Sequence, residues 1–310
     1  MKWGYKRAFA RCALLFAVGA ALQFISGNIN PYILRYPLGL ILSINYIYVL
    51  ILLSAKADKW AWVRQLSDHH ASVSSLASML IMTLIFGLTR QDGSPEGLSG
   101  LLGFSSMSTS WPFCILLLYF ITVLGMRTIE EIRHWRRHPV MTTVIHASVF
   151  VVLTAAFFGC GDKAKVRIVA ETGIPLHTGV SSQTGRLTTL PFMLTLEEFI
   201  MEEYDPEQIL LPDGKTIVMQ KAEPKTFLSR VKIEDSKGER RLDIKVNHPA
   251  RIGAWRIYQM GYDKEKSTST LECVKDGWYR VIQVGLWIIL AAGAGMAFTA
   301  GYKRKKEKGV

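Results

Sequence analysis

The sequence predicts an α-helical polytopic membrane protein of six transmembrane helices, with one extracytoplasmic β-rich domain inserted between helices five and six. Three observations lead to this fold class: six apolar runs, a long polar stretch between the last two runs, and basic residues gathered on alternate loops. The chain of 310 residues is 49% hydrophobic, with a mean hydropathy of +0.20. These averages conceal a sharp division between apolar runs and one charged region, as in polytopic membrane proteins.

Each apolar run is treated as a candidate span because a helix of roughly 20 apolar residues crosses a bilayer. The first run could instead be a signal peptide, since it has a basic start and a short apolar core, but no clear small-x-small cleavage site follows. Trp111 and Pro112 lie at the start of the fourth run, where residues of the membrane interface are common. The predicted spans are residues 12–25, 36–55, 73–89, 111–126, 140–160 and 281–300.

Lysine and arginine set the orientation, because cytoplasmic loops carry an excess of them. One side receives the N-terminal group, the loop with Lys56 and Lys59, the cluster at 133–137 and the tail at 303–308; the short loops on the other side carry only Arg35 and Arg90. This predicts both termini in the cytoplasm and residues 162–280 outside. The net charge of +12 does not indicate nucleic acid, because the basic residues sit beside apolar runs.

The outer region alternates polar and apolar residues, as half-buried strands do. Strands are expected at 165–169, 230–234 and 241–246, and turns at 212–215 and 235–238. Periodicity does not decide whether residues 196–203 form a helix or a strand. The predicted division is residues 1–59 for two additional helices, 60–161 for helices three to five, 162–280 for the β-rich domain and 281–310 for the last helix and its basic tail.

The four cysteines form neither C-x-x-C nor C-x-x-C-H. This excludes a thiol oxidoreductase of the usual spacing and a c-type cytochrome. Cys160 and Cys273 both fall on the predicted outer side and could pair, but sequence does not show proximity.

An ionisable side chain, His146, lies inside the fifth apolar run. Such residues are costly in a membrane and usually mark a site. One such site is an axial ligand of haem iron, which takes imidazole; proton relays and interhelical hydrogen bonds are the alternatives. Phe150, Leu153 and Phe157 follow on the same helical face, where they could flank a porphyrin or simply pack. Other histidines have plainer interpretations: His69 and His70 as a solvated helix start that could meet incoming haem, His134 and His138 as contacts to lipid phosphates, and His177 and His248 as surface residues.

Three segments of the outer region share one pattern with a known family. Residues 190–204 read LPFMLTLEEFIMEEY, residues 224–231 read PKTFLSRV, and residues 245–263 contain KVNHP, Gly253 and YQMGYD. Their order and spacing resemble the ResB (CcsB) family of cytochrome c biogenesis proteins. The resemblance covers roughly residues 60–300 and leaves out the first two spans.

The resemblance implies a role in the assembly route called system II, in the bacterial inner membrane. There, ResB-type and CcsA-type proteins form a complex that carries haem outward and attaches it to the C-x-x-C-H cysteines of apocytochrome c. His146 occupies the place of the family's haem-ligating histidine, which makes it the expected axial ligand of the iron of haem b, with Phe150 and Phe157 beside it. The partner supplies the opposite histidine and a tryptophan-rich loop, which this chain lacks, so it is expected to be one inactive half of a holocytochrome c synthase.

Two other functions stay open at this point. One is a non-catalytic scaffold that stabilises the CcsA-type partner or chaperones apocytochrome without binding haem. The other is a sensor or transporter subunit with an outer β domain. The haem content of the purified complex, measured with His146 present and with His146 replaced, distinguishes a haem-binding synthase subunit from the scaffold.

Overall fold

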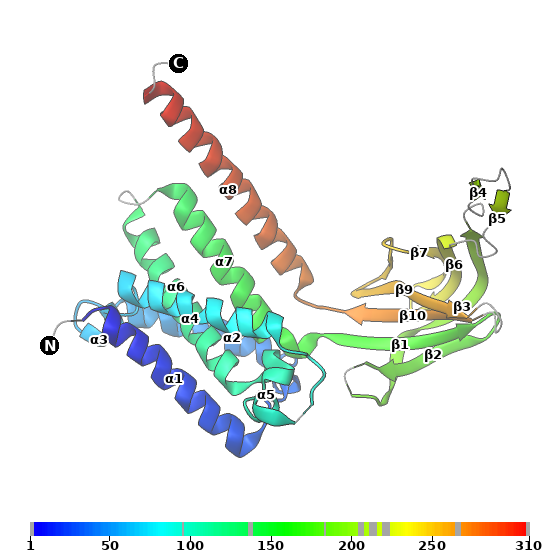
Figure 1. Ribbon diagram of the computed structural model, residues 1–310, viewed down its shortest axis with the longest axis horizontal. Helices are drawn as coiled ribbons and strands as arrows, with labels where there is room; N and C mark the ends of the chain where they lie inside the picture. The colour runs from blue at the N-terminus through cyan, green and yellow to red at the C-terminus, as the bar shows by residue number, and fades with distance from the viewer. Residues whose placement is uncertain are drawn as a thin grey trace. The chain divides into compact units, whose positions relative to one another are not determined.

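The computed structural model describes residues 3–94, 96–135, 139–182, 184–203, 208–210, 216–218, 224–263 and 268–307. The chain divides into two compact units (Figure 1). The helical unit comprises residues up to Asp162 and those from Trp278 onward, and the β unit comprises Lys163–Gly277. In chain order the β unit lies between helices α7 and α8.

The helical unit is built from long helices joined by short helical turns. Its long helices are α1 Tyr5–Ser26, α2 Leu38–Ser54, α4 His69–Leu88, α6 Trp111–Arg133, α7 Val140–Phe158 and α8 Tyr279–Glu307. The short elements are η1 Pro31–Leu34, α3 Ala61–Arg64, α5 Gly97–Leu101, η2 Phe104–Thr109 and η4 Cys160–Asp162.

Five of these helices, α1, α4, α6, α7 and the part of α8 from Tyr279 to Thr299, are long and apolar enough to cross a membrane. This confirms the prediction of an apolar, multi-helix membrane architecture. The predicted span at 36–55 coincides with α2, which is apolar but only 17 residues long. A sixth crossing therefore remains a prediction.

Helix ends follow capping and charge pairing more than hydropathy. α4 begins four residues before its predicted span because Asp68 accepts a hydrogen bond from the backbone N–H of His70 and so caps the helix. α6 continues to Arg133, beyond the predicted end at residue 126. Its last turns are polar, and Arg127 pairs there with Glu130 and Glu131 at helical spacing.

α6 is the central helix of this unit and packs against α1, α2, α4 and α7. Glycines allow the close approaches, as small residues do in helix bundles within membranes. A Cβ atom on Gly19 of α1 would lie 2.6 Å from Pro112 Cα of α6, and one on Gly125 of α6 would lie 2.6 Å from Phe150 Cε2 of α7. At Gly19 the two backbones therefore meet, whereas at Gly125 the Phe150 ring occupies the space that a side chain would need.

The β unit is an antiparallel sheet of eight strands, ordered β7-β6-β3-β2-β1-β10-β9-β8. This confirms the prediction of a β-rich domain. The strands are β1 Ala164–Glu171, β2 Pro175–Ser181, β3 Leu187–Glu203, β6 Pro224–Asp235, β7 Gly238–Lys245, β8 Ala250–Ile252, β9 Trp255–Asp263 and β10 Thr268–Lys275, with a separate pair β4 Gln208–Leu210 and β5 Thr216–Val218.

Several local predictions can be compared with these strands. Residues 196–203, left undecided between helix and strand, belong to β3. The predicted turn at 235–238 joins β6 to β7, and Asp235 pairs with Gly238 across it. The predicted turn at 212–215 and Tyr204 of the family pattern lie outside the described residues.

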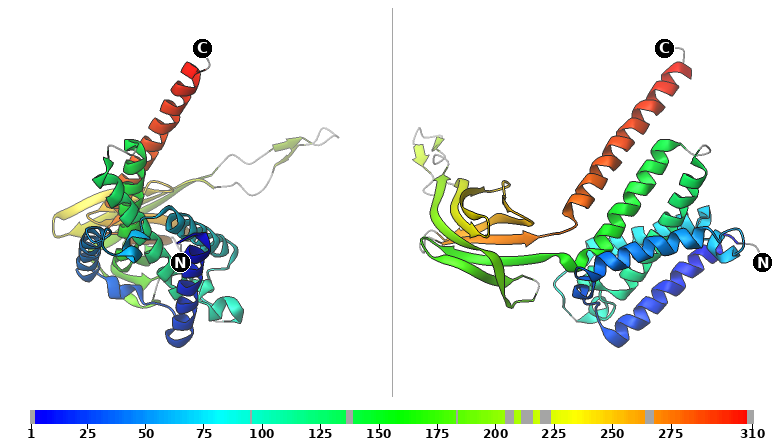
Figure 2. Two further views of the ribbon diagram at one scale, coloured as in Figure 1. Left: turned by 90° about the vertical axis from the view of Figure 1, so that its left-hand side faces the viewer. Right: turned by 180° about the vertical axis from the view of Figure 1, so that it is seen from behind.

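The sheet curls on itself (Figure 2). β7 and β8 are at the two ends of the strand order, yet the chain passes from one to the other through residues 246–249 alone, where Lys245 and His248 form a bridge. In β1, β8 and β10 every second residue is buried and points into one apolar core. Its fully buried members include Leu194, Leu196, Ile233, Ile244, Ile257 and Leu271.

The residues that carry the family pattern meet in two clusters of this unit. Phe199 of β3, Phe227 of β6 and Tyr262 of β9 form an aromatic cluster, with Phe227 and Tyr262 ring centroids 4.7 Å apart. Ser229 and Ser269 are fully buried. Both bond to the side chain of Gln259, with Ser229 Oγ 2.6 Å from Oε1 and Ser269 Oγ 2.8 Å from Nε2.

Replacing Gly19 by alanine should destabilise the helical unit, because the new methyl group meets the backbone of Pro112. We expect a loss of about 1–3 kcal/mol, the usual cost of overpacking. Thermal unfolding of the full chain in detergent measures it. Gly87→Ala in α4 is the matched control, since no atom lies within 4 Å of its added Cβ; it should be neutral or stabilising, because alanine favours helix. Equal effects of the two changes would contradict the close α1–α6 contact.

Replacing Gln259 by leucine should destabilise the β unit, because two buried serine hydroxyls lose their shared partner. The expected cost is about 1–3 kcal/mol. Hydrogen exchange of β6, β9 and β10 in the full chain would report it as faster exchange. Met260→Leu, at a neighbouring side chain that is 54% exposed, should leave exchange unchanged.

Candidate functional site

A cavity of about 610 Å³ lies among α4, α6 and α7 of the helical unit. On each helix the lining residues recur every three or four positions, so that each helix presents one face. Most of the wall is apolar, and its ionisable groups are two histidines, one arginine and one glutamate. The lining comprises His69, Ser72 and Leu76 of α4; Phe120, Val123, Leu124, Arg127 and Glu131 of α6; and Pro139, Thr142, His146 and Val149 at the start of α7.

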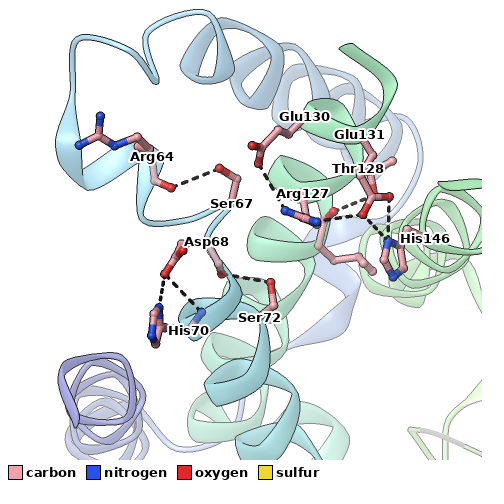
Figure 3. A network of polar contacts seen from close by, with 11 residues as sticks. Arg64, Ser67, Asp68, His70, Ser72, Arg127, Thr128, Glu130, Glu131 and His146 are labelled. Atoms are coloured by element: carbon pink, nitrogen blue, oxygen red, sulfur yellow. Dashed lines mark hydrogen bonds and ion pairs between the residues drawn. The ribbon is translucent and has the colours of Figure 1, made fainter. Parts of the chain in front are cut away.

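His146 enters this cavity from α7. It lies about 9 Å along the helix from Val140, at about 1.5 Å per residue. Its Nδ1 atom is 2.9 Å from Oε2 and 3.1 Å from Oε1 of Glu131 on α6 (Figure 3). The Glu131 side chain is 3% exposed, whereas that of His146 is 34% exposed. The carboxylate is therefore buried behind the imidazole, and the ring remains accessible.

Arg127 approaches the same carboxylate from one helical turn earlier. Its Nε donates to Glu131 Oε1 at 3.0 Å, and its guanidinium also lies 3.8 Å from Glu130 Oε2. An isolated buried carboxylate would be very costly, and a paired, hydrogen-bonded one is tolerated. Arg127 supplies the countercharge, so the pairing holds Glu131 in place beside His146.

This arrangement leaves His146 able to bind a metal through its second ring nitrogen. When Nδ1 carries the proton and donates it to Glu131, Nε2 keeps its lone pair. Metal-binding histidines usually donate their other N–H to a carboxylate or a carbonyl in this way, which fixes the tautomer and raises ligand basicity. A single imidazole in an apolar wall fits the axial position of haem iron, and the cavity falls within the usual size range of ligand sites.

A second, smaller cavity of about 350 Å³ adjoins the first. The two share His69 and Arg127. Its wall is polar and includes Arg64, Gln65, Ser67 and Asp68 from α3 and the segment before α4. Together the cavities offer an apolar space followed by a polar, partly cationic one.

Comparison with known proteins identifies the family. A model of the ResB-like family matches residues 134–293, about half of the chain. The chain belongs to the ResB-like family. The matched part includes α7 with His146, the whole β unit and about half of α8, up to residue 293.

Two further comparisons add little to the ResB-like assignment. Among solved structures, this ResB-like chain is similar to "Cytochrome c Heme Lyase CcmF", with 11% sequence identity and a TM-score of 0.33. The similarity covers 83% of this chain and 45% of that one, so the ResB-like chain spans less than half of its length. No match to a curated protein was found.

The predicted aromatic companions of His146 lie in the helix core of the ResB-like protein. Phe150 is 9% exposed and packs against Gly125 and Leu50. Phe157 packs against Phe158, with centroids 5.2 Å apart, and against the same core as Leu153. Among the described residues, α7 lines the cavity with Thr142 and Val149 instead. A place for Phe150 and Phe157 beside a porphyrin stays a prediction, and ordinary packing accounts for both side chains.

Sequence reasoning missed Glu131 and Arg127, the groups that hold His146. The signal that could have found them is their spacing of four residues on a helix that follows directly from an apolar run. The apolar run ends at residue 126, so both residues were predicted to lie in the loop that follows it. Nothing in the sequence indicated that Glu131 is buried against α7.

The remaining histidines have distinct surroundings. His70 Nδ1 lies 2.6 Å from Asp68 Oδ2, which also accepts from Trp3 Nε1 at 2.7 Å. Burial acts to raise the pKa of Asp68, but the hydrogen bonds from His70 and Trp3 outweigh it and the pKa is lowered. His134 is exposed, and His138 lies outside the described residues. On the β unit, His177 and His248 are exposed, as predicted.

Arg133 of the predicted lipid-facing cluster has a structural role. Its guanidinium donates to the backbone carbonyl and the hydroxyl of Ser54, both at 3.1 Å. These bonds cap the last turn of α2, where carbonyl groups lack helical partners. The arginine therefore fixes the C-terminal end of α6 to the C-terminal end of α2.

None of the four cysteines, all of which lie in the described part of the chain, forms a disulfide. Cys273 is fully buried in the core of the β unit, and burial, aided by the neighbouring Glu272 carboxylate, raises the pKa of its thiol to about 12. A thiol in this state is a poor nucleophile.

Proposed function

We propose that this protein is the ResB-type membrane subunit of the system II cytochrome c synthase. It binds haem b within the membrane through His146, assists its export, and takes part with a CcsA-type partner in attaching it to apocytochrome c. The partner supplies the tryptophan-rich loop, and this chain alone is not a haem lyase. Family membership supports the pathway, and the surroundings of His146 support haem as the ligand.

In this proposal the chain crosses the inner membrane six times, with α2 as the sixth crossing and both termini in the cytoplasm. At about 1.5 Å per residue the 17 residues of α2 extend roughly 26 Å, close to the thickness of the hydrocarbon core. The distribution of lysine and arginine then leaves the β unit on the outer side. There it holds apocytochrome c or the partner subunit.

The observation that carries the proposal is the hydrogen bond between His146 Nδ1 and the buried Glu131 carboxylate. A histidine that only joined two helices would need one such bond and could be fully enclosed. Here one nitrogen is held by a carboxylate with its own countercharge, and the ring borders a cavity that is large enough for a ligand. His146 provides the axial ligand, Glu131 orients it, and Arg127 neutralises Glu131.

The two adjoining cavities match the two parts of haem. The apolar wall formed by Leu76, Phe120 and Val149 suits the macrocycle. The polar cavity, with Arg64 and Arg127, suits the two propionate groups, because guanidinium groups bind carboxylates strongly. Haem taken from the inner side would meet the polar cavity first, since α3 and the start of α4 lie at the predicted cytoplasmic end.

Replacing His146 by alanine should remove most of the haem from the purified complex of this chain with its CcsA-type partner, because the iron loses its ligand from this chain. A pyridine haemochrome assay, normalised to protein, measures the content. His134→Ala is the matched control, since His134 is an exposed histidine outside the cavity lining. If the His146→Ala complex assembles and keeps its haem, the chain acts as a scaffold and the proposal is wrong.

Replacing Glu131 by glutamine should weaken haem binding without abolishing it, because the amide keeps the shape but holds the imidazole less firmly. The loss of a carboxylate behind a ligating histidine typically lowers affinity about 10–100-fold. Titration of the full chain with haem gives the affinity. Glu96→Gln, at an exposed glutamate outside the lining of both cavities, should bind like the unaltered chain. If the unaltered chain, Glu131→Gln and the control variant all bind haem with the same affinity, Glu131 does not contribute to the ligand site.

A further inference from the structure

The segment between α2 and α4 carries an exposed aromatic pair. Trp60, which directly precedes α3, is 46% exposed, and Trp62 within α3 is 51% exposed. Their rings stack, with centroids 5.9 Å apart and planes 19° from parallel. Neither ring belongs to the lining of the two cavities. Joined apolar surfaces of this kind mark contact sites, and tryptophan is enriched where a membrane meets water.

The fold holds this pair on the outside of the helical unit. The backbone N–H groups of Trp60 and Arg64 donate to the carbonyl groups of Lys56 and Trp60, at 2.9 and 3.1 Å, in successive turns. Ala57 and Val63 of the same segment pack into the helix core, where Val63 is fully buried. Because one side of the segment is anchored in the core, its other side presents the two tryptophans outward.

Basic side chains accompany the pair. Lys56 and Lys59 are exposed, and within the part of the chain that the structure describes their side chains form no hydrogen bond or ion pair. Arg64 adds a third positive charge, and Asp58 is the one acidic residue in the sequence from 55 to 67. Basic residues beside a membrane helix are attracted to anionic lipids. The charge of this segment therefore complements an anionic membrane surface.

The end of α2 places the pair at the level of lipid headgroups. Ile51 and Leu52, in the last turns of this apolar helix, are both 49% exposed and present apolar surface outward. Exposed basic residues follow from Lys56 onward. This change from apolar to basic side chains is typical of the boundary between hydrocarbon and headgroups, where interfacial tryptophans lie. Trp60 and Trp62 come directly after it.

We propose that Trp60, Trp62, Lys56 and Lys59 form a binding surface for anionic phospholipid headgroups. The indole rings insert at the membrane interface, and the two ammonium groups contact lipid phosphates. Since α3 also contributes to the wall of the polar cavity, the bound lipids lie beside that cavity. On the proposed topology they belong to the inner leaflet. This sidedness rests on the proposed function, whereas the lipid contact itself requires no haem.

The test uses the full chain, reconstituted in vesicles of phosphatidylcholine that contain phospholipids brominated at shallow or deep acyl positions. Bromine quenches nearby tryptophan fluorescence, and the difference between the unaltered chain and Trp60→Phe/Trp62→Phe isolates the signal of the pair. We expect shallow bromines to quench this signal about twofold more strongly than deep ones, as for interfacial rings. Trp287→Phe is the matched control. Trp287 is 65% exposed and lies about 12 Å along α8 from Tyr279, so deep bromines should quench its signal more strongly.

A second measurement tests the role of charge. Brominated phosphatidylglycerol should quench the signal of the tryptophan pair about twofold more strongly than brominated phosphatidylcholine at the same mole fraction, because anionic lipid gathers at the lysines. Lys56→Gln/Lys59→Gln should abolish this preference. Arg35→Gln/Arg90→Gln removes two exposed cations from other loops and should preserve it.

Three outcomes would overturn the inference. The first is a pair that brominated lipids do not quench and aqueous iodide does, which indicates a face open to water or to a protein. The second is equal quenching by the two lipid classes, and the third is a preference that survives Lys56→Gln/Lys59→Gln. None of these measurements involves haem, so the haem proposal is decided separately by His146→Ala.

Discussion

The buried carboxylate of Glu131 is the constraint on which the helical unit depends. A carboxylate that is 3% exposed inside an apolar bundle is stable only with partners. Arg127 provides one within α6, and His146 provides the other from α7. The same contacts join two helices, select the ring nitrogen that faces the cavity, and keep the imidazole at its edge. Packing of α6 against α1, α2 and α4 then holds this group in place.

The family pattern and the proposed site fall on different residues. Phe199, Phe227 and Tyr262 stack on one another, and Ser229, Gln259 and Ser269 form a buried polar network. These residues specify how the strands of the β unit meet. The groups around the cavity, apart from His146, belong to no part of that pattern. The resemblance therefore reflects mainly the architecture of the β unit, and the support for the proposed haem site comes from the cavity.

Much of the architecture could be predicted from sequence because its causes are local. Apolar runs gave the long helices, and alternation gave β1, β6 and β7. Helix ends were missed where capping by Asp68 or pairing of Arg127 with Glu131 extended a helix past its apolar residues. The curl of the sheet could not be predicted, because it depends on which distant strands are neighbours. Among the site residues, His146 could be identified because an ionisable side chain inside a membrane span costs free energy. Glu131 could not, because it is buried only by the packing of α7 against α6.

The two connections between the units leave from neighbouring points. In the β unit the first and last strands are paired, with Ala164 opposite Lys275, and Lys163 lies 3.8 Å from Asp276. In the helical unit Trp278 Nε1 donates to Asp162 Oδ2 at 2.7 Å. Within each unit, contacts thus join the segment at which the chain enters to the segment at which it leaves. A segment whose two ends are tied this closely can be lengthened, shortened or exchanged during evolution, or replaced by an unrelated cassette in the laboratory, without separating the helices that flank it in the chain.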